Sequence, residues 1–347
     1  MSLTDSAVTA DQQVARVFEW RRGFNAMHVM DLGIELGLFQ ALAGAPGSSA
    51  AALAQATALH PPYVRTWLWT AHGFGMVDAD GEDAFRLAPH FDAILASPGH
   101  PRYLGGFVRL GTEFATEDYR AARQAFRTGQ VAPFQGRGEV FARAIAESTW
   151  GLQLATAKKL LPALEGLVAA LEAGGAVLEV GCGTANFLVQ LAKAFPAARA
   201  VGVDIDPSGL EVARERIREA GLEQRVELRA GRVGEVVAPG SVEACVMIEV
   251  LHEIAKPIRP AVVAEAARAL KPGGWMLIVD ETYPSTLAQT RAPEFRFPLQ
   301  TGIEELTWGN EIPDREEQEW LLREAGFQGE IRRSIIGEGF TVLATRR

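Results

Sequence analysis

The spacing of apolar residues changes near residue 170. Beyond this point short apolar runs alternate with segments in which apolar residues recur at helical spacing. The runs at 176–180, 198–203, 226–228, 244–250 and 275–279 predict five strands, and the last 20 residues predict two more. Helices are expected between them, including 260–270, which ends at Lys271-Pro272-Gly273-Gly274, and 316–324. This alternation predicts an α/β fold.

The first 100 residues show a different pattern. Helical spacing predicts helices over 14–42, 48–59 and 61–73. Two short strands, 76–77 and 85–87, are then expected on either side of Asp80-Gly81. Helices followed by a small hairpin are typical of a winged helix. Residues 101–168 are expected to be mostly helical and to connect the two parts.

The charge of the chain disfavours nucleic-acid binding. Its formal net charge is -9, and residues 1–100 contain five arginines, no lysine and ten acidic residues. A phosphate-binding surface needs clustered positive charge. The aromatic residues of the would-be recognition helix, Trp67 and Trp69, are better explained by packing or dimer contact. We therefore expect no nucleic-acid partner.

Other features of the sequence predict a cytoplasmic protein. No run of 18 or more apolar residues suggests a membrane span, and residues 1–20 lack the basic and apolar segments of a signal peptide. The two cysteines, Cys182 and Cys245, fit a reducing compartment and cannot form a zinc cluster by themselves. We expect neither a metal site nor a membrane partner.

A glycine turn follows the strand predicted at 176–180. Gly181 and Gly183 let the chain turn sharply and let a ligand approach the backbone. Glu179, two residues before Gly181, would repel a pyrophosphate but suits a ligand that carries an ammonium and a sulfonium. Asp204, 23 residues after Gly181, stands where an acid accepts ribose hydroxyls. For each acid alone, a solvated carboxylate at a strand end is the alternative.

Three segments together resemble the motifs of class I S-adenosylmethionine-dependent methyltransferases: 177–184, 201–204 and 270–274. The resemblance implies a Rossmann-like seven-stranded sheet with its last strand antiparallel, and S-adenosyl-L-methionine as the cofactor. It implies that Glu179, Gly181 and Gly183 surround the methionine part and that Asp204 holds the ribose. No acid follows the third strand, so adenine contacts there are expected from backbone and apolar groups. The remaining residues that we assign to the cofactor are Cys182, Ile205, Gly231, Arg232 and Glu249.

The amino-terminal half resembles the winged-helix segment of small-molecule methyltransferases. Residues 35–39 with Leu42, and 59–65, carry this similarity. It implies that the segment forms a homodimer and covers the substrate pocket. The expected division is therefore a winged-helix and dimerisation domain over 1–100, a helical linker over 101–168, and a cofactor-binding catalytic domain over 169–347.

His252 is the main candidate for catalysis. It follows the fourth strand at its carboxyl end, where open α/β sheets bind ligands, and an imidazole can accept a proton near neutral pH. Asp280, Glu281 and Glu311 are candidates for orienting it. The arrangement resembles plant-type O-methyltransferases in the pair His252-Glu253, in the 28-residue interval to Asp280 and, more loosely, in Glu311. Ile254 stands where a tryptophan is usual. Three roles remain open for His252: a general base, a group that positions the substrate, and a structural residue.

The sequence therefore favours an O-methyltransferase that acts on a small aromatic hydroxyl compound. N-, C- or S-methylation on the same fold is one alternative. A non-catalytic ligand-sensing protein and an NAD-dependent oxidoreductase are others. Phe295, Phe297 and Trp308 either line the acceptor site or pack in the core.

Overall fold

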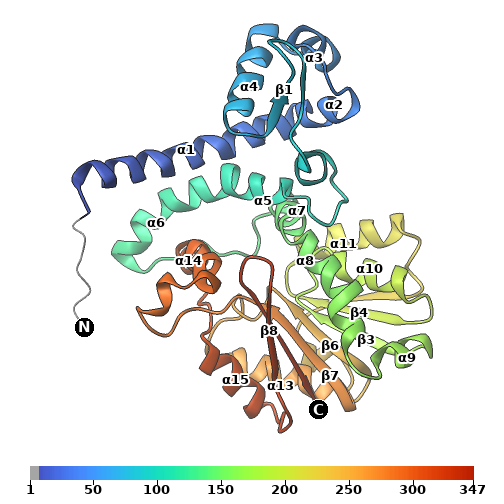
Figure 1. Ribbon diagram of the computed structural model, residues 1–347. Helices are drawn as coiled ribbons and strands as arrows, with labels where there is room; N and C mark the ends of the chain where they lie inside the picture. The colour runs from blue at the N-terminus through green and yellow to red at the C-terminus, as the bar shows by residue number, and fades with distance from the viewer. Residues whose placement is uncertain (1–7) are drawn as a thin grey trace. The chain divides into compact units, whose positions relative to one another are not determined.

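The computed structural model describes residues 8–347, which form two compact units (Figure 1). The first unit ends at Phe114 and the second begins at Ala115. Residues 1–7, part of the segment in which we expected no signal peptide, lie outside the described residues. None of the helices within 8–347 is long and apolar enough to cross a membrane.

The first unit has the predicted order of helices followed by a hairpin. Its strands pair antiparallel, with Val77 opposite Leu87. Short π-helical turns cover Asp92–Ala96 and Leu110–Ala115. The regular elements are α1 (Ala10–Glu35), α2 (Leu38–Gly44), α3 (Ala50–Thr57), α4 (Pro61–Gly73), β1 (Val77–Ala79), β2 (Phe85–Leu87) and α5 (Gly105–Arg109).

The segment predicted as one helix over 14–42 is two helices, α1 and α2. Gly37 separates them with a φ of +69°, a left-handed conformation that glycine adopts without steric cost. The break lets Phe39 turn into a small core with Leu68. Trp67 also belongs to this core, and its Nε1 donates a hydrogen bond to the carbonyl of Val29. Trp67 is thus a packing residue, one of the two explanations suggested by the sequence.

The second unit contains a seven-stranded sheet in the order β5-β4-β3-β6-β7-β9-β8. The first five strands in this order are parallel, and β9 runs antiparallel to both of its neighbours. The predicted sheet with an antiparallel last strand is therefore confirmed. The strands are β3 (Ala176–Val180), β4 (Arg199–Asp204), β5 (Val226–Ala230), β6 (Val242–Ile248), β7 (Leu270–Asp280), β8 (Arg332–Ile336) and β9 (Phe340–Arg346).

Strand β7 begins five residues earlier than the sequence pattern indicated. Leu270 pairs with Val242, the register then shifts, and Trp275 pairs with Ala244. The intervening Lys271-Pro272-Gly273 is exposed. The proline–glycine signal therefore ends the preceding helix at Ala269 but does not delay the strand, because the sheet accommodates the extra residues in an irregular register.

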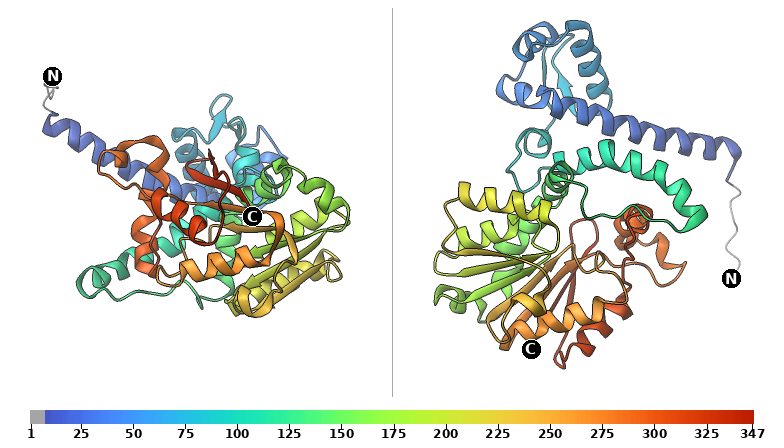
Figure 2. Two further views of the ribbon diagram at one scale, coloured as in Figure 1. Left: turned by 90° about the horizontal axis from the view of Figure 1, so that it is seen from below. Right: turned by 180° about the vertical axis from the view of Figure 1, so that it is seen from behind.

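Helices cover both faces of this sheet (Figure 2). Successive residues of β3 point to opposite sides, so Val177 packs in one core with α10 and Leu178 in the other with α13. The helices of this unit are α6 (Thr116–Thr128), α7 (Glu139–Ser148), α8 (Trp150–Ala155), α9 (Leu167–Glu172), α10 (Asn186–Ala194), α11 (Pro207–Glu219), α12 (Val233–Val236), α13 (Arg259–Ala269), α14 (Arg296–Trp308) and α15 (Arg315–Glu324).

The strand order reverses beside β3, because the chain proceeds from β3 to β4 and β5 and then returns to place β6 on the other side of β3. In open α/β sheets ligands bind at the carboxyl ends of the strands next to such a reversal. The glycine turn after β3 and the segment with His252 after β6 therefore emerge side by side.

Candidate active site

The glycine turn has a backbone that a side chain would disrupt. Gly181 has a φ of +67°, and a Cβ atom there would lie 2.5 Å from Cγ2 of Val250. The turn leads into α10 at Asn186, whose Nδ2 donates a 2.9 Å hydrogen bond to the carbonyl of Ala146. Asn186, at the third position of the glycine pattern, therefore anchors α10 to α7.

Glu179 carries a buried carboxylate oxygen without a partner. The residue is 2% exposed, and its Oε2 accepts no hydrogen bond within the described part of the chain. Burial, and secondarily the charge of Asp204, raise its pKa well above the ordinary value. A buried carboxylate of this kind is stabilised by a cation. The ammonium of S-adenosylmethionine fits this requirement.

Asp204 fastens the glycine turn to the end of β4. Its Oδ2 accepts a 2.7 Å hydrogen bond from the backbone N–H of Gly183, and its Oδ1 accepts a 2.8 Å bond from that of Asp206. Each carboxylate oxygen can accept more than one hydrogen bond. The side chain can therefore hold the turn and still accept ribose hydroxyls.

The remaining residues assigned to the cofactor lie in different environments. Ile205 is 66% exposed, next to Asp204. The N–H of Gly231 donates to the carbonyl of Asp204 at 3.0 Å, while the guanidinium of Arg232 pairs with Glu265 at 2.7 Å. The Cys182 side chain is buried, and burial raises its thiol pKa well above the ordinary value. Cys182 is thus suited to packing and unsuited to nucleophilic attack.

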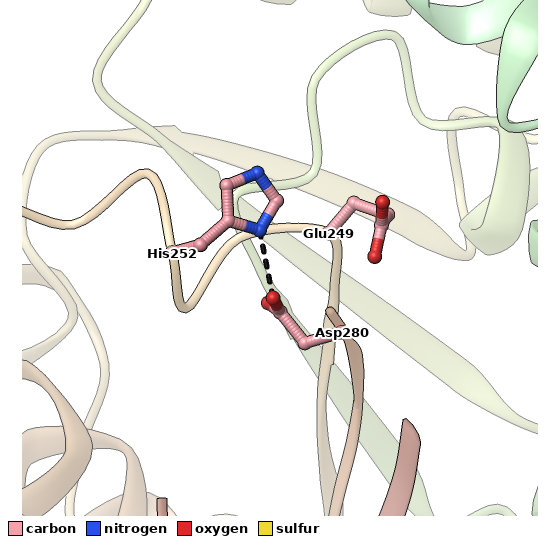
Figure 3. Close-up of side chains that lie close together, drawn as sticks. All are labelled: Glu249, His252 and Asp280. Carbon is pink, nitrogen blue, oxygen red and sulfur yellow. Dashed lines mark hydrogen bonds and ion pairs between the residues drawn. The ribbon is translucent and has the colours of Figure 1, made fainter. Parts of the chain in front are cut away.

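His252 and Asp280 form a buried hydrogen-bonded pair (Figure 3). Nδ1 of His252 lies 2.7 Å from Oδ1 of Asp280, and the two residues are 3% and 0% exposed. Oδ2 of Asp280 accepts hydrogen bonds from the backbone N–H groups of Val250 and Leu251, at 3.1 and 2.7 Å. The carboxylate is thus fixed by the turn after β6, and it in turn fixes the imidazole.

The second acid beside His252 is Glu305. Its Oε2 lies 3.6 Å from Nε2 of His252 and accepts a 2.9 Å hydrogen bond from Nδ2 of Asn310. The structure does not bring Glu311 to this place. The Glu311 side chain is 58% exposed, and its carboxylate lies 3.8 Å from Nζ of Lys256. Sequence reasoning missed Glu305, because its place beside His252 depends on how α14 packs, and no local pattern around Glu305 indicates this.

Two more carboxylates lie in this cluster. Glu281 is buried, and its Oε2 accepts a 2.7 Å hydrogen bond from Oγ1 of Thr301 on α14. Glu249 has a φ of +56°, and its buried Oε1 accepts no hydrogen bond from any described residue. One ligand atom each of Glu249, His252 and Asp280 lies within 4.8 Å of the others. Backbone strain at a non-glycine residue of this kind is typical of functional sites.

Comparison with known proteins supports a methyltransferase site. A protein-family model described as "Methyltransferase domain" matches residues 177–274, which include the glycine turn, Asp204 and His252. The structure of human N-acetylserotonin methyltransferase in complex with S-adenosylmethionine superposes with a TM-score of 0.77. It covers 100% of this chain and 99% of that chain at 17% identity, so this likeness concerns the fold. The chain is an S-adenosylmethionine-dependent methyltransferase.

Two bacterial relatives match most of this methyltransferase. The tetracenomycin polyketide synthesis 8-O-methyl transferase of Streptomyces glaucescens is 26% identical over 272 residues, 76% of this chain and 77% of the relative. The 3-hydroxy-5-methyl-1-naphthoate 3-O-methyltransferase of Streptomyces sahachiroi is 26% identical over 304 residues, 84% of this chain and 83% of the relative. The sequence-based expectation of such a fold, enzyme class and cofactor is confirmed.

The charges around His252 favour the imidazolium form in this methyltransferase. Burial alone lowers the pKa of His252, but the negative charges of Asp280 and Glu305 raise it, and the net result lies well above the ordinary value. The raised pKa favours the protonated imidazole, with Nδ1 directed to Asp280. For the neighbouring carboxyl group of Glu281, burial raises the pKa to about 7.

The spacing of Glu249, His252 and Asp280 also suits a metal ion, but the hydrogen bonds argue for another role. Asp280 already accepts four N–H groups: the backbone N–H groups of Val250, Leu251 and Glu281, and Nδ1 of His252. A metal ion bound to Asp280 would have to displace some of these hydrogen bonds. The arrangement is better suited to orienting an imidazole.

Core packing, one of the two explanations given for Phe295, Phe297 and Trp308, applies to two of them. Trp308 is buried at 6% exposure against Phe134 and Phe141, and its Nε1 donates a 3.0 Å hydrogen bond to Oδ2 of Asp118. Phe297 packs on Phe340, with ring centroids 4.8 Å apart. Phe295 is half-buried. Core packing therefore accounts for Trp308 and Phe297.

Proposed function

We propose that this methyltransferase transfers the methyl group of S-adenosylmethionine to the hydroxyl oxygen of a small aromatic compound, with His252 as the general base. The observation that carries the proposal is the buried pair of His252 and Asp280 at the carboxyl ends of β6 and β7. The names of the two bacterial relatives describe transfer to oxygen, and one of them names a hydroxynaphthoate acceptor.

The residues proposed to hold the cofactor surround the turn after β3. Glu179 would face the ammonium of the methionine part, the backbone of Gly181, Cys182 and Gly183 would lie against it, and Asp204 would accept the ribose hydroxyls. Ile205, Gly231, Arg232 and Glu249 complete the proposed set, with backbone groups of Gly231 and Arg232 near the adenine. When bound, the cofactor supplies a methyl carbon activated by its sulfonium.

His252 is proposed to remove the proton of the acceptor hydroxyl. Asp280 accepts a hydrogen bond from Nδ1–H of His252, so Nε2 is the ring nitrogen left to act as a base. Because the pKa of His252 is raised, the imidazole must first lose its Nε2 proton, and this state becomes more populated as pH increases. After proton transfer the imidazolium is stabilised by the charges of Asp280 and Glu305. The two acids are thus positioning residues.

N-, C- and S-methylation are the main alternatives, because an acceptor that is already nucleophilic does not require a base. A labelled-methyl assay decides between them. The protein is incubated with methyl-¹³C S-adenosylmethionine and a panel of phenols, naphthols, anilines and thiophenols, and the products are examined by NMR. The proposal expects the label on oxygen. Label found solely on nitrogen, carbon or sulfur would overturn it.

A ligand-sensing protein without activity is the alternative from another class. In the labelled-methyl assay such a protein would bind S-adenosylmethionine without forming S-adenosylhomocysteine. The orphaned carboxylate of Glu179 accounts for binding in both cases, so turnover is the discriminating measurement.

A further inference from the structure

Arg259, the first residue of α13, is a completely buried arginine. Its side chain is 0% exposed. A buried charge is costly unless it is paired and hydrogen-bonded. Nη1 of Arg259 pairs with Oε1 of Glu317 on α15 at 2.6 Å, and the two helices pack together (Figure 1). This ion pair compensates the charge but uses only part of the guanidinium, which has five N–H donors.

Other donors of this guanidinium are directed at the backbone that carries His252. Nε of Arg259 donates to the carbonyl of Ile254 at 3.1 Å, and Nη2 donates to the carbonyl of His252 at 3.3 Å. Residues 249–258 form neither a helix nor a strand. Within residues 8–347, these two carbonyls accept hydrogen bonds only from Arg259. The turn after β6 is therefore held at its carbonyl groups by Arg259 and at its N–H groups by Asp280.

The same side chain holds the segment next to Glu305. Nη2 of Arg259 donates to the carbonyl of Glu311 at 2.7 Å. The preceding residue, Asn310, donates from Nδ2 to Oε2 of Glu305 at 2.9 Å and from its backbone N–H to the carbonyl of Glu305 at 2.8 Å. Oε2 of Glu305 in turn lies 3.6 Å from Nε2 of His252. Arg259 thus connects the backbone of His252 with the segment that fixes the carboxylate on the other side of the imidazole.

We propose that Arg259 is a positioning residue, which fixes the imidazole of His252 between Asp280 and Glu305. The inference rests on the proposed role of His252 as the base. The planar fork of a guanidinium is required, because three carbonyls and one carboxylate need donors in fixed directions. The single ammonium of a lysine has three donors on one nitrogen and cannot reach all four acceptors. A displacement of about 1 Å far from the chemistry can decrease turnover about 100-fold, so this clamp should affect the rate.

A purely structural role is the alternative, because a buried ion pair between α13 and α15 also affects folding. Two variants separate the roles. Arg259→Lys keeps a positive charge beside Glu317 but removes most donors to the carbonyls. Glu317→Gln removes the counter-charge but leaves Arg259 its contacts with the carbonyls. Arg268→Lys is the matched control, since it makes the same substitution at an exposed position of the same helix.

The test is an NMR titration of His252 in the full-length protein, labelled with ¹⁵N-histidine and loaded with S-adenosylhomocysteine. The signal that is missing from His252→Ala assigns the residue. In the wild type the neutral imidazole should carry its proton on Nδ1, facing Asp280, with a pKa well above the ordinary value. Arg259→Lys should give a mixture of both tautomers and a pKa closer to the ordinary value. Glu317→Gln and Arg268→Lys should keep the wild-type signal.

Turnover and S-adenosylhomocysteine affinity are measured on the same proteins. For Arg259→Lys we expect kcat to decrease about tenfold or more, while the affinity changes less than about threefold. A wild-type His252 signal in Arg259→Lys, or an equal change of this signal in Glu317→Gln, would overturn the inference. If Arg259→Lys does not fold, Arg259→Gln replaces it in every measurement. A changed His252 signal with unchanged kcat contradicts the proposed function instead, because Arg259 would then fix an imidazole that is not the base.

Discussion

Nδ1 of His252 lies 2.7 Å from Oδ1 of Asp280, and both side chains are almost completely buried. The same carboxylate accepts the backbone N–H groups of Val250 and Leu251. The orientation of the imidazole and the shape of the turn after β6 therefore depend on one side chain. A change at Asp280 should affect stability and activity together.

Asp280→Asn tests this dependence. An amide NH₂ would face N–H donors, and the buried imidazolium would lose its counter-charge. Removing one partner of a buried ion pair costs about 3–5 kcal/mol, so we expect a comparable decrease in the free energy of unfolding together with loss of turnover. Urea unfolding and kcat measure the two effects, with Glu316→Gln as the control. Unchanged values of both would contradict the role assigned to Asp280.

The next prediction compares Glu305→Gln with Glu311→Gln. Glu305 raises the pKa of His252, so its loss should move the alkaline rise of kcat to lower pH and decrease turnover. Glu311 is exposed and paired with Lys256, so its substitution should affect kcat much less. The pH profiles of both variants provide the measurement. A larger effect at Glu311 would restore the assignment made from the sequence.

Stability should decrease as pH rises from about 5 to 8. Burial raises the pKa of Glu281 and of Glu304 to about 7, whereas the unfolded carboxyls ionise near 4.5. A raised folded-state pKa contributes stability below the unfolded pKa, and this contribution is lost as pH rises through the folded pKa. Since each unit of pKa shift corresponds to about 1.4 kcal/mol, the Tm should decrease by several degrees. Thermal unfolding across this range checks the sign.

The matched variant for this pH effect is Glu281→Gln combined with Glu304→Gln. The Tm of the double variant should depend less on pH than that of the wild type, because neither amide titrates. If the wild-type Tm increases between pH 5 and 8, the two carboxyls do not control stability in this range.

We predict that the protein forms a homodimer through α1 of the amino-terminal unit. Several large apolar side chains of α1 are exposed, among them Phe18 at 70%, Trp20 at 66% and Val17 at 58%. Several exposed large apolar side chains on one helix are typical of an interaction site. Light scattering should show a dimer for the wild-type protein and a monomer for Phe18→Glu. A monomeric wild type would reject the prediction.

The sequence predicted the features that depend on local pattern. Apolar runs indicated the seven strands, and His252 and Asp280 could be placed near each other because they follow or end neighbouring parallel strands, β6 and β7. The interval of 28 residues between them was taken from the resemblance to plant-type O-methyltransferases. The break at Gly37 was missed because apolar spacing continues through it. Glu311 was chosen because it precedes the last helix. Its position, however, depends on tertiary contacts: its carbonyl accepts from Arg259, which also pairs with Glu317. No local pattern contains this information.

The central claim, that His252 is the base for transfer to oxygen, is tested most directly by His252→Ala. Turnover with a hydroxyaromatic acceptor and S-adenosylhomocysteine affinity are measured side by side against the wild type. We predict that kcat decreases about 10²–10⁴-fold, the usual contribution of a general base, while cofactor affinity changes less than about threefold. Turnover at neutral pH that survives the substitution, with the cofactor still bound, would contradict the claim.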